Sequence, residues 1–235
     1  MRERDTPGIE EGRLYVVSTP IGNLGDITFR ALEVLKGVDL VVAEDTRRTG
    51  RLLAHYQVQN RITSYHDYNK EKKTPVLIKK LLSGRSIALV SDAGTPGISD
   101  PCYFLVKRAI DNGIPVVPIP GASAFLSALV VSGLPTDRFL FEGFLPHKGS
   151  QRRKRLLELR EEKRTLIFYE SPHRIVEMLS DALEILGDRE TSISRELTKK
   201  FEETVKGRLS ELVAKFQLKR PKGEFVVIVS GNQEE

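Results

Sequence analysis

Short apolar runs alternate with segments of helical periodicity along the first half of the chain. Apolar runs bounded by turn residues are typical of buried strands, and the segments between them suit amphipathic helices. The predicted strands are 14–18, 39–44, 62–66, 86–91 and 115–119. The predicted helices are 28–36, 46–56, 74–83, 101–112 and 121–132. This alternation predicts βαβ units and a largely parallel sheet that is buried on both faces.

The pattern restarts after a glycine–proline turn at 133–137. Further strands are predicted at 139–144, 165–170, 192–197 and 225–230, and helices at 148–163 and 174–186. We therefore expect a loose tail over 1–12, an N-terminal α/β domain over 13–134 and a C-terminal α/β domain over 135–235. A cleft at a domain junction is a common place for a ligand.

Composition narrows the class of protein. The 235 residues are 40% hydrophobic and 29% charged, as in ordinary globular proteins. The net charge of +5 favours a polyanionic partner. The single cysteine, Cys102, excludes an internal disulfide and a multi-cysteine zinc site. Because the four histidines are scattered along the chain, no metal site is expected.

The longest uncharged stretch, 113–135, is interrupted by three prolines. The three are Pro115, Pro118 and Pro120, and the part after Pro120 is shorter than the ~20 residues that a membrane helix needs. The first residues are charged and lack the apolar core of a signal peptide. We expect a cytoplasmic protein without a membrane partner.

Three glycine-containing loops follow predicted strands, at the sheet edge where open α/β proteins bind ligands. The first, TPIGNLGDIT at 19–28, lacks the lysine of a phosphate-binding loop and the glycine spacing of a dinucleotide loop. Asp26 in it either caps the next helix or serves the chemistry. Glu44 and Asp45 end the following strand, which keeps nicotinamide-cofactor binding open as an alternative.

The second loop, SDAGTPGISDP at 91–101, has two glycines, two prolines and two aspartates in eleven positions. Such a loop exposes backbone groups and lets a ligand approach closely. The third, PIPGASAFLSAL at 118–129, has small residues at a helix start, which suit either a ligand or tight helix–sheet packing.

Further segments accompany these loops in order: AEDTRRTGRLL, FEGFLP, FYESPHR and RELTKKFEE. The series closely resembles the RsmI-type enzymes, bacterial methyltransferases of the tetrapyrrole-methylase superfamily that act on a ribose 2′-hydroxyl of 16S ribosomal RNA. It extends from residue 13 to about residue 230. One departure is Cys102, where the family usually has glycine.

The resemblance implies two α/β domains of the tetrapyrrole-methylase type with S-adenosylmethionine (SAM) in the cleft between them. It also implies a homodimer and a decoding-centre cytidine of 16S rRNA, within the 30S subunit, as the target. A tetrapyrrole-like small molecule is the alternative substrate on the same fold. By resemblance, the cofactor contacts are Gly22, Asp92, Gly94, Thr95, Ile98, Ser123, Ala124, Phe168, Tyr169 and Gly223.

A proton acceptor would assist a ribose hydroxyl, which is a weak nucleophile. The catalytic candidates are Asp26, Glu44 and Lys199, the last as a group that orients a phosphate. Other acceptors at strand ends are Asp45, His66, Asp67, Glu170 and Glu196. The expected RNA contacts are Arg47, Arg48, Arg51, Lys148, Arg152, Arg153 and Arg155. The basic residues within 148–155 have an alternative interpretation. They would then form a solvated helix face, paired with Glu158, Glu161 and Glu162, and would not contact RNA.

Overall fold

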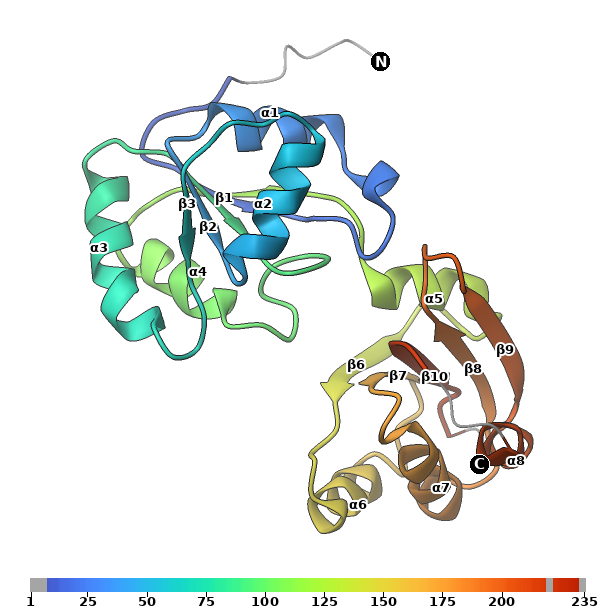
Figure 1. Cartoon of the computed structure of the whole chain (residues 1–235). Coiled ribbons are helices and arrows are strands. Elements are labelled where there is room, and N and C mark those ends of the chain that lie inside the picture. Colours follow the sequence, from blue (N-terminus) through green and yellow to red (C-terminus); the bar gives the residue numbers. More distant parts are fainter. Residues whose placement is uncertain (1–7, 219–221, 233–235) are drawn as a thin grey trace. The chain divides into compact units, whose positions relative to one another are not determined.

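The computed structural model describes residues 8–218 and 222–232, which form two compact units (Figure 1). The chain divides between Ser123 and Ala124, about ten residues before the turn where the sequence pattern restarts. The predicted tail lies partly outside the described residues. Each unit is built around its own five-stranded sheet.

The first unit is a regular β/α alternation. Its strands are β1 (Leu14–Val17), β2 (Leu40–Ala43), β3 (Ile62–Ser64), β4 (Ile87–Val90) and β5 (Val116–Ile119). Its helices are α1 (Phe29–Gly37), α2 (Thr46–His55), α3 (Lys70–Leu82) and α4 (Cys102–Asp111), and a 3-10 turn covers Leu24–Asp26. The strand order is β3-β2-β4-β1-β5 and every pair is parallel, as the alternation predicts.

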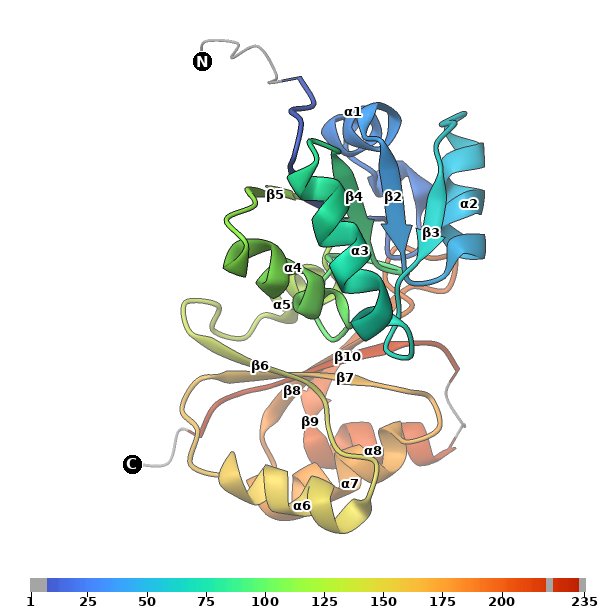
Figure 2. The same cartoon turned by 90° about the vertical axis from the view of Figure 1, so that its left-hand side faces the viewer.

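Both faces of this sheet are covered, which explains why its strands are continuous apolar runs. Leu35 of α1 and Leu53 of α2 pack on one face with Val17 and Val41. On the other face, the buried side chains of α3 and α4 pack against Leu14 and the strands beside it (Figure 2). Because all five strands are parallel, the loops that follow them meet at one edge of the sheet.

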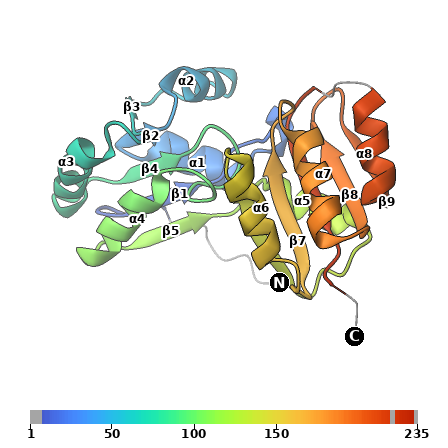
Figure 3. The same ribbon diagram turned by 90° about the horizontal axis from the view of Figure 1, so that it is seen from below.

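The second unit has a mixed sheet. Its strands are β6 (Phe139–Phe144), β7 (Thr165–Glu170), β8 (Glu190–Arg195), β9 (Glu203–Arg208) and β10 (Phe225–Val229), in the order β6-β7-β10-β8-β9. Only β6 and β7 run parallel. The helices α6 (Gly149–Glu158), α7 (Ile175–Leu186) and α8 (Leu209–Leu218) cover one face (Figure 3).

The opposite face of the second sheet carries α5 (Ala124–Ser132). Ala128 and Leu129 of this helix pack against Ile167, Val226 and Ile228 of the sheet. The sequence places α5 with the strand before it, in the first domain. The boundary in the structure therefore lies before α5 and not after it. An apolar helix between two sheets can cover either one, and α5 covers the second sheet.

Within the described ranges no helix has the length and apolar character of a membrane span.

Candidate functional site

The first two glycine loops are joined into one assembly at the edge of the first sheet. The backbone N–H of Thr19 donates to the Gly94 carbonyl at 2.9 Å, and the Gly94 N–H donates back at 3.0 Å. The hydroxyl oxygens of Ser18 and Thr95 lie 2.9 Å apart. Because β4 and β1 are neighbours in the sheet, Ser18 and Thr95 meet here although they are 77 positions apart in sequence.

The third loop closes on the other two. The Thr95 hydroxyl donates to the Ala122 carbonyl at 3.4 Å. A Cβ at Gly121 would lie 2.8 Å from the Ser18 Cβ, so this position requires glycine. Gly94 has φ +75°, and a Cβ there would lie 3.4 Å from Cγ2 of Ile21. At least part of the glycine content therefore serves to pack the loops against one another.

Carboxylates gather at the same edge. One oxygen of Asp92 accepts a hydrogen bond from the Asp45 N–H at 2.9 Å, and the other lies 3.4 Å from Arg48 Nη1. Glu44, half-buried beside them, has a pKa raised above its ordinary value by burial and by the charge of Asp92. This edge is therefore suited to a cationic group or to hydroxyl donors.

Asp45 itself is the N-cap of α2. Its carboxylate accepts from the Arg47 N–H at 2.8 Å and from the Arg47 guanidinium, also at 2.8 Å. Hydrogen bonds from Arg47 hold the pKa of Asp45 well below its usual range. Asp45 is thus committed to shaping the helix start.

Asp100 shapes the end of the second loop. Its carboxylate accepts from the Gly97 N–H and the Cys102 N–H, each at 2.8 Å. Cys102 is fully buried, and burial raises the pKa of its thiol far above the ordinary value. The thiol is therefore a packing group and not a nucleophile.

The first loop corrects the predicted cap. Thr28 is the N-cap of α1 and accepts from the Ala31 N–H at 3.1 Å. Asn23 caps the 3-10 turn, which Asp26 ends as an exposed residue. Capping by Asp26 is wrong, because Thr28 directly precedes the helix and threonine is also an accepted cap type. Gly22 is exposed in the same loop.

The remaining predicted cofactor residues of the glycine loops and the helix after them differ in exposure. Ile98 is 40% exposed, while Ser123 and Ala124 are partly buried. Ala124 begins α5 and packs against the second unit's core.

Phe168 and Tyr169 point to opposite faces of the second sheet. Phe168 is fully buried in the core under α6, α7 and α8. The Tyr169 ring lies 5.1 Å from that of Phe141, on the face that α5 covers, and burial raises its pKa. Because the Phe168 side chain is buried, a cofactor contact at this residue would be through its backbone.

Lys199 lies between two carboxylates. Its Nζ is 2.8 Å from an oxygen of Glu196 and 2.9 Å from an oxygen of Glu224. Burial would lower the pKa of Lys199, but the hydrogen bonds to both glutamates raise it. Gly223, with φ +101°, lies against Glu196, and a Cβ there would collide with Cγ of that residue. Gly223 therefore has a local packing role, whatever else it contacts.

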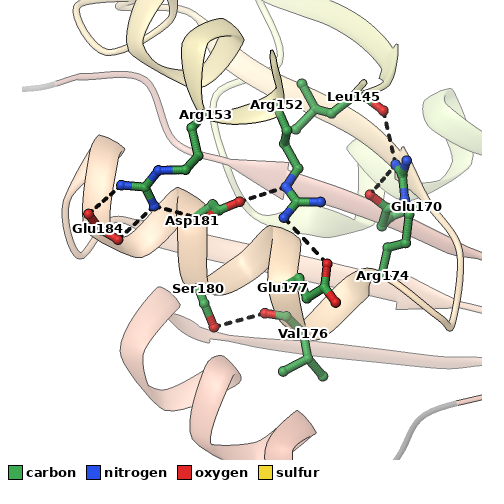
Figure 4. A network of polar contacts seen from close by, with 10 residues as sticks. All are labelled: Leu145, Arg152, Arg153, Glu170, Arg174, Val176, Glu177, Ser180, Asp181 and Glu184. Carbon is green, nitrogen blue, oxygen red and sulfur yellow. Dashed lines mark hydrogen bonds and ion pairs between the residues drawn. The ribbon is translucent and has the colours of Figure 1, made fainter. Parts of the chain in front are cut away.

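The arginines of α6 are engaged with carboxylates of neighbouring elements (Figure 4). Arg152 is 5% exposed and binds Asp181 of α7 at 2.7 Å. Arg153 binds the same Asp181 at 2.8 Å and also Glu184. Arg155 binds Glu142 of β6 and Glu158, each at 2.7 Å. RNA contact by Arg152 is wrong because the side chain is buried.

The alternative interpretation of α6, a solvated face paired with Glu158, Glu161 and Glu162, is only partly correct. Glu158 does pair with Arg155, but Glu161 and Glu162 pair with Arg160 and Arg164 instead. The main carboxylate partners come from α7 and β6, which local sequence spacing does not reveal. Lys148, at the start of α6, is exposed.

A second ion pair fixes the end of β7. Arg174 donates to both oxygens of Glu170, at 2.9 and 2.7 Å, and to the Leu145 carbonyl at 3.0 Å (Figure 4). The Glu170 side chain has no exposed surface. Because both oxygens of Glu170 are bound to Arg174 and the side chain has no exposed surface, a substrate cannot reach it, and Glu170 leaves the list of candidates.

The arginines of α2 differ in their partners. Arg47 binds Asp45 and Arg48 binds Asp92. Arg51 is exposed, and no carboxylate partner is found for it in the described part of the chain. Arg51 is thus the best placed of the three for a phosphate.

Among the residues that the structure describes, no group of three or more histidine, cysteine, aspartate or glutamate side chains is arranged to hold a metal ion.

The two sheets define a known class of α/β protein. The fold is shared with uroporphyrin-III-C-methyltransferase from Thermus thermophilus, with a TM-score of 0.65 and 20% identity over 92% of this chain and 94% of that one. It is also shared with cobalt precorrin-4 methyltransferase, a cobalamin biosynthetic enzyme (TM-score 0.67, 14% identity, 93% and 95% of the two chains). Residues 13–213 match the tetrapyrrole (corrin/porphyrin) methylases, and the chain belongs to this family.

Two relatives within the family are similar to this chain over nearly its whole length. It is 55% identical to ribosomal RNA small subunit methyltransferase I of Halalkalibacterium halodurans, over 96% of this chain and 78% of that protein. It is 50% identical to the protein of the same name from Escherichia coli O157:H7, over 99% and 82%. The nicotinamide alternative has no support in these matches.

Proposed function

We propose that this chain is a SAM-dependent methyltransferase of small-subunit ribosomal RNA. The identity of 55% over nearly the whole chain to a ribosomal RNA small subunit methyltransferase I carries this proposal. The alternative, a tetrapyrrole-like substrate, is supported by the shared fold alone, at 20% identity or less for the two solved structures compared above. Because ribosomal RNA is the proposed substrate, we also propose that the protein acts in the cytoplasm.

The edge of the first sheet fits the cofactor chemically. SAM carries a positive sulfonium and ammonium group, and its ribose offers hydroxyl donors. Glu44 and Asp92 supply negative charge and acceptors at this edge. Gly94, whose φ of +75° disfavours any other residue, brings the backbone of the second loop next to Thr95 and the first loop. A related solved structure, a uroporphyrin-III C-methyltransferase, is a complex with S-adenosylhomocysteine.

The acceptor is inferred to be a ribose 2′-oxygen of a decoding-centre cytidine. When bound, SAM supplies an electrophilic methyl group. The 2′-oxygen would take the methyl group as its bond to sulfur breaks, SAM would leave as the neutral thioether S-adenosylhomocysteine, and the hydroxyl proton would pass to a carboxylate of the site. Holding the reactants in line would supply much of the barrier reduction. We favour Glu44 as the acceptor of the ribose proton, because a raised pKa brings a carboxyl group closer to the working pH.

A direct experiment tests the whole proposal. The protein is incubated with methyl-labelled SAM and 30S subunits from cells that lack this modification, and the label is mapped to one nucleotide and atom. We expect one ribose 2′-O-methyl group in 16S rRNA and none on a target carrying a 2′-deoxy nucleotide. Label on a base, or on a tetrapyrrole but not on RNA, would contradict the proposal.

The homodimer remains part of the proposal. Its support is the apolar surface of α5, where Leu126, Val130 and Val131 are 46%, 72% and 47% exposed. Sedimentation velocity of wild type and Val130→Asp tests it. We expect a dimer for the wild type and a shift toward monomer for the variant.

A further inference from the structure

The turn between β8 and β9 has an unusual backbone. Glu196 and Thr198 both have positive φ, at +50° and +68°. Residues other than glycine rarely adopt this conformation, which costs about 1–2 kcal/mol at each position. Such strain persists only where surrounding contacts fix the backbone, and it is concentrated at functional sites.

Contacts from both sides of the turn hold it in place. The Glu196 N–H donates to the Glu224 carbonyl, and the Glu224 N–H donates to the Glu196 carboxylate, both at 3.1 Å. Lys199 joins the same two glutamates through its ammonium group. Glu202 accepts from the Thr198 N–H, and its own N–H donates to the Lys199 carbonyl at 3.1 Å. The carboxylates of this turn are therefore used internally.

What this rigid turn presents to solvent is an aromatic ring beside a cation. Phe201 is 66% exposed, and Lys200 Nζ lies 5.7 Å from the centre of its ring. Lys200 and Lys222 are exposed, and neither has a carboxylate partner within the described residues. The core of the unit makes little use of the Phe201 ring, although exposure of so large an apolar group is unfavourable.

We propose that Phe201 stacks on an unpaired base of the RNA substrate and that Lys200 binds an adjacent phosphate. This inference rests on the proposed RNA substrate. Sequence-specific RNA proteins place splayed bases on aromatic rings, and each such stack is strong enough to matter when flanked by positive charge. A fixed backbone lowers the entropy lost when the ring is immobilised.

The test separates the aromatic ring from apolar area. Phe201→Leu keeps an apolar side chain but removes the stacking surface, whereas Phe201→Trp retains it. Tyr103→Leu, at an aromatic residue of α4 that is 65% exposed, is the matched control. Equilibrium binding to unmodified 30S subunits is measured for each, together with SAM affinity by calorimetry and the melting temperature.

We expect Phe201→Leu to weaken subunit binding by about 5- to 100-fold, from the typical worth of one base–aromatic stack. Phe201→Trp and Tyr103→Leu should bind within about twofold of wild type, and SAM affinity and melting should not change. Unchanged binding in Phe201→Leu, or equal losses in Phe201→Leu and Phe201→Trp, overturns the inference alone. Failure of the wild type to bind the subunits overturns the proposed function and this inference with it.

Discussion

Glu44 is a carboxyl group whose ionisation the fold opposes. Its folded pKa is raised above 4.5 by burial and by Asp92. A carboxyl group of this kind binds its proton more tightly in the folded chain, so its contribution to stability is present below its unfolded pKa. That contribution is lost as the pH rises through the raised folded value.

We therefore predict that Glu44→Gln, which cannot ionise, melts at a higher temperature than wild type at pH 7. The two melting temperatures should converge as the pH falls below 4.5. Thermal unfolding in the absence of SAM, followed across this range, measures the difference. A difference that stays constant with pH would contradict the assigned cause.

The same substitution should impair function while it improves stability. If Glu44 accepts the ribose proton, Glu44→Gln lowers turnover by about 10²-fold or more, with subunit binding unchanged. Asp26→Asn is the comparison. Asp26 is exposed and does not cap α1, so the Asp26→Asn protein should be as stable as the wild type. A fall in turnover for Asp26→Asn alone would move the proton acceptor to the first loop.

Gly94 allows backbone strain and loop contact to be separated. Gly94 and Gly113 have similar φ values of +75° and +69°, but a Cβ at Gly113 would meet nothing within 4 Å. Alanine at either position should cost about 1–2 kcal/mol of stability. Only Gly94→Ala should weaken SAM binding, by about tenfold or more, because Gly94 lies in the loop proposed to hold SAM and strain at its positive φ would disturb the hydrogen bonds to Thr19. Calorimetry on both variants checks this, and equal SAM affinities would place the second loop outside the cofactor site.

At this scale the sequence predicts loops better than individual contacts. The dense composition of 91–101 indicates a special loop, and the structure joins it to Ser18 and Thr19. Residue types do not say which of two possible caps is used: Asp26 and Thr28 both precede α1, and Thr28 is the cap. The partners of Arg152 lie 25 and 29 positions away on another helix, beyond the reach of local spacing.

Among the elements, α6 is attached to the fold through its arginines. Removing one member of a buried ion pair leaves an uncompensated charge and costs about 3–5 kcal/mol. We predict a loss of about 3 kcal/mol in the free energy of unfolding for Arg152→Ala, toward the lower limit because Arg153 still pairs with Asp181. Urea unfolding measures it. Lys154→Ala, an exposed neighbour on the same helix, should change stability by less than about 0.5 kcal/mol.

Elements of the first unit are predictable because a parallel sheet buried on both faces has continuous apolar strands. The second unit is harder. β9, with the sequence ETVKGR, is a partly exposed edge strand, so it lacks an apolar signature, and α8 follows it without a turn signal. The place of α5 depends on which sheet it covers, which is a tertiary property that its own apolar residues do not encode.

For the whole molecule, the net charge of +5 matters less than which cations are unpaired. Arg152, Arg153 and Arg155 are each neutralised by carboxylates. Of the arginines predicted to contact RNA, Arg51 is the one for which the described structure gives no such partner. The excess of positive charge in the sequence therefore does not come from the arginines of α6, although their spacing suggests a basic surface there.

We predict that Arg51→Gln reduces the slope of log affinity for 30S subunits against log salt concentration by about 1. Arg164→Gln is the control, because Arg164 already binds Glu162 at 2.7 Å and should leave the slope unchanged. Binding titrations at several salt concentrations measure both. Equal slopes for Arg51→Gln and wild type would remove α2 from the RNA surface.

The order of strands in the second sheet has a consequence for how the protein is made. β10, the last strand along the described chain, lies in the middle of that sheet, between β7 and β8. On the ribosome, the first unit has all its strands once residue 119 has emerged. The other sheet has both of its strand pairs, β6–β7 and β8–β9, once residue 208 has emerged. The pairs stay unjoined until residue 229 follows, which takes about one to four seconds at typical synthesis rates. During that interval the facing edges of β7 and β8 are unpaired, and unpaired strand edges are prone to aggregate. We therefore expect the nascent chain to need holding chaperones late in synthesis and not early.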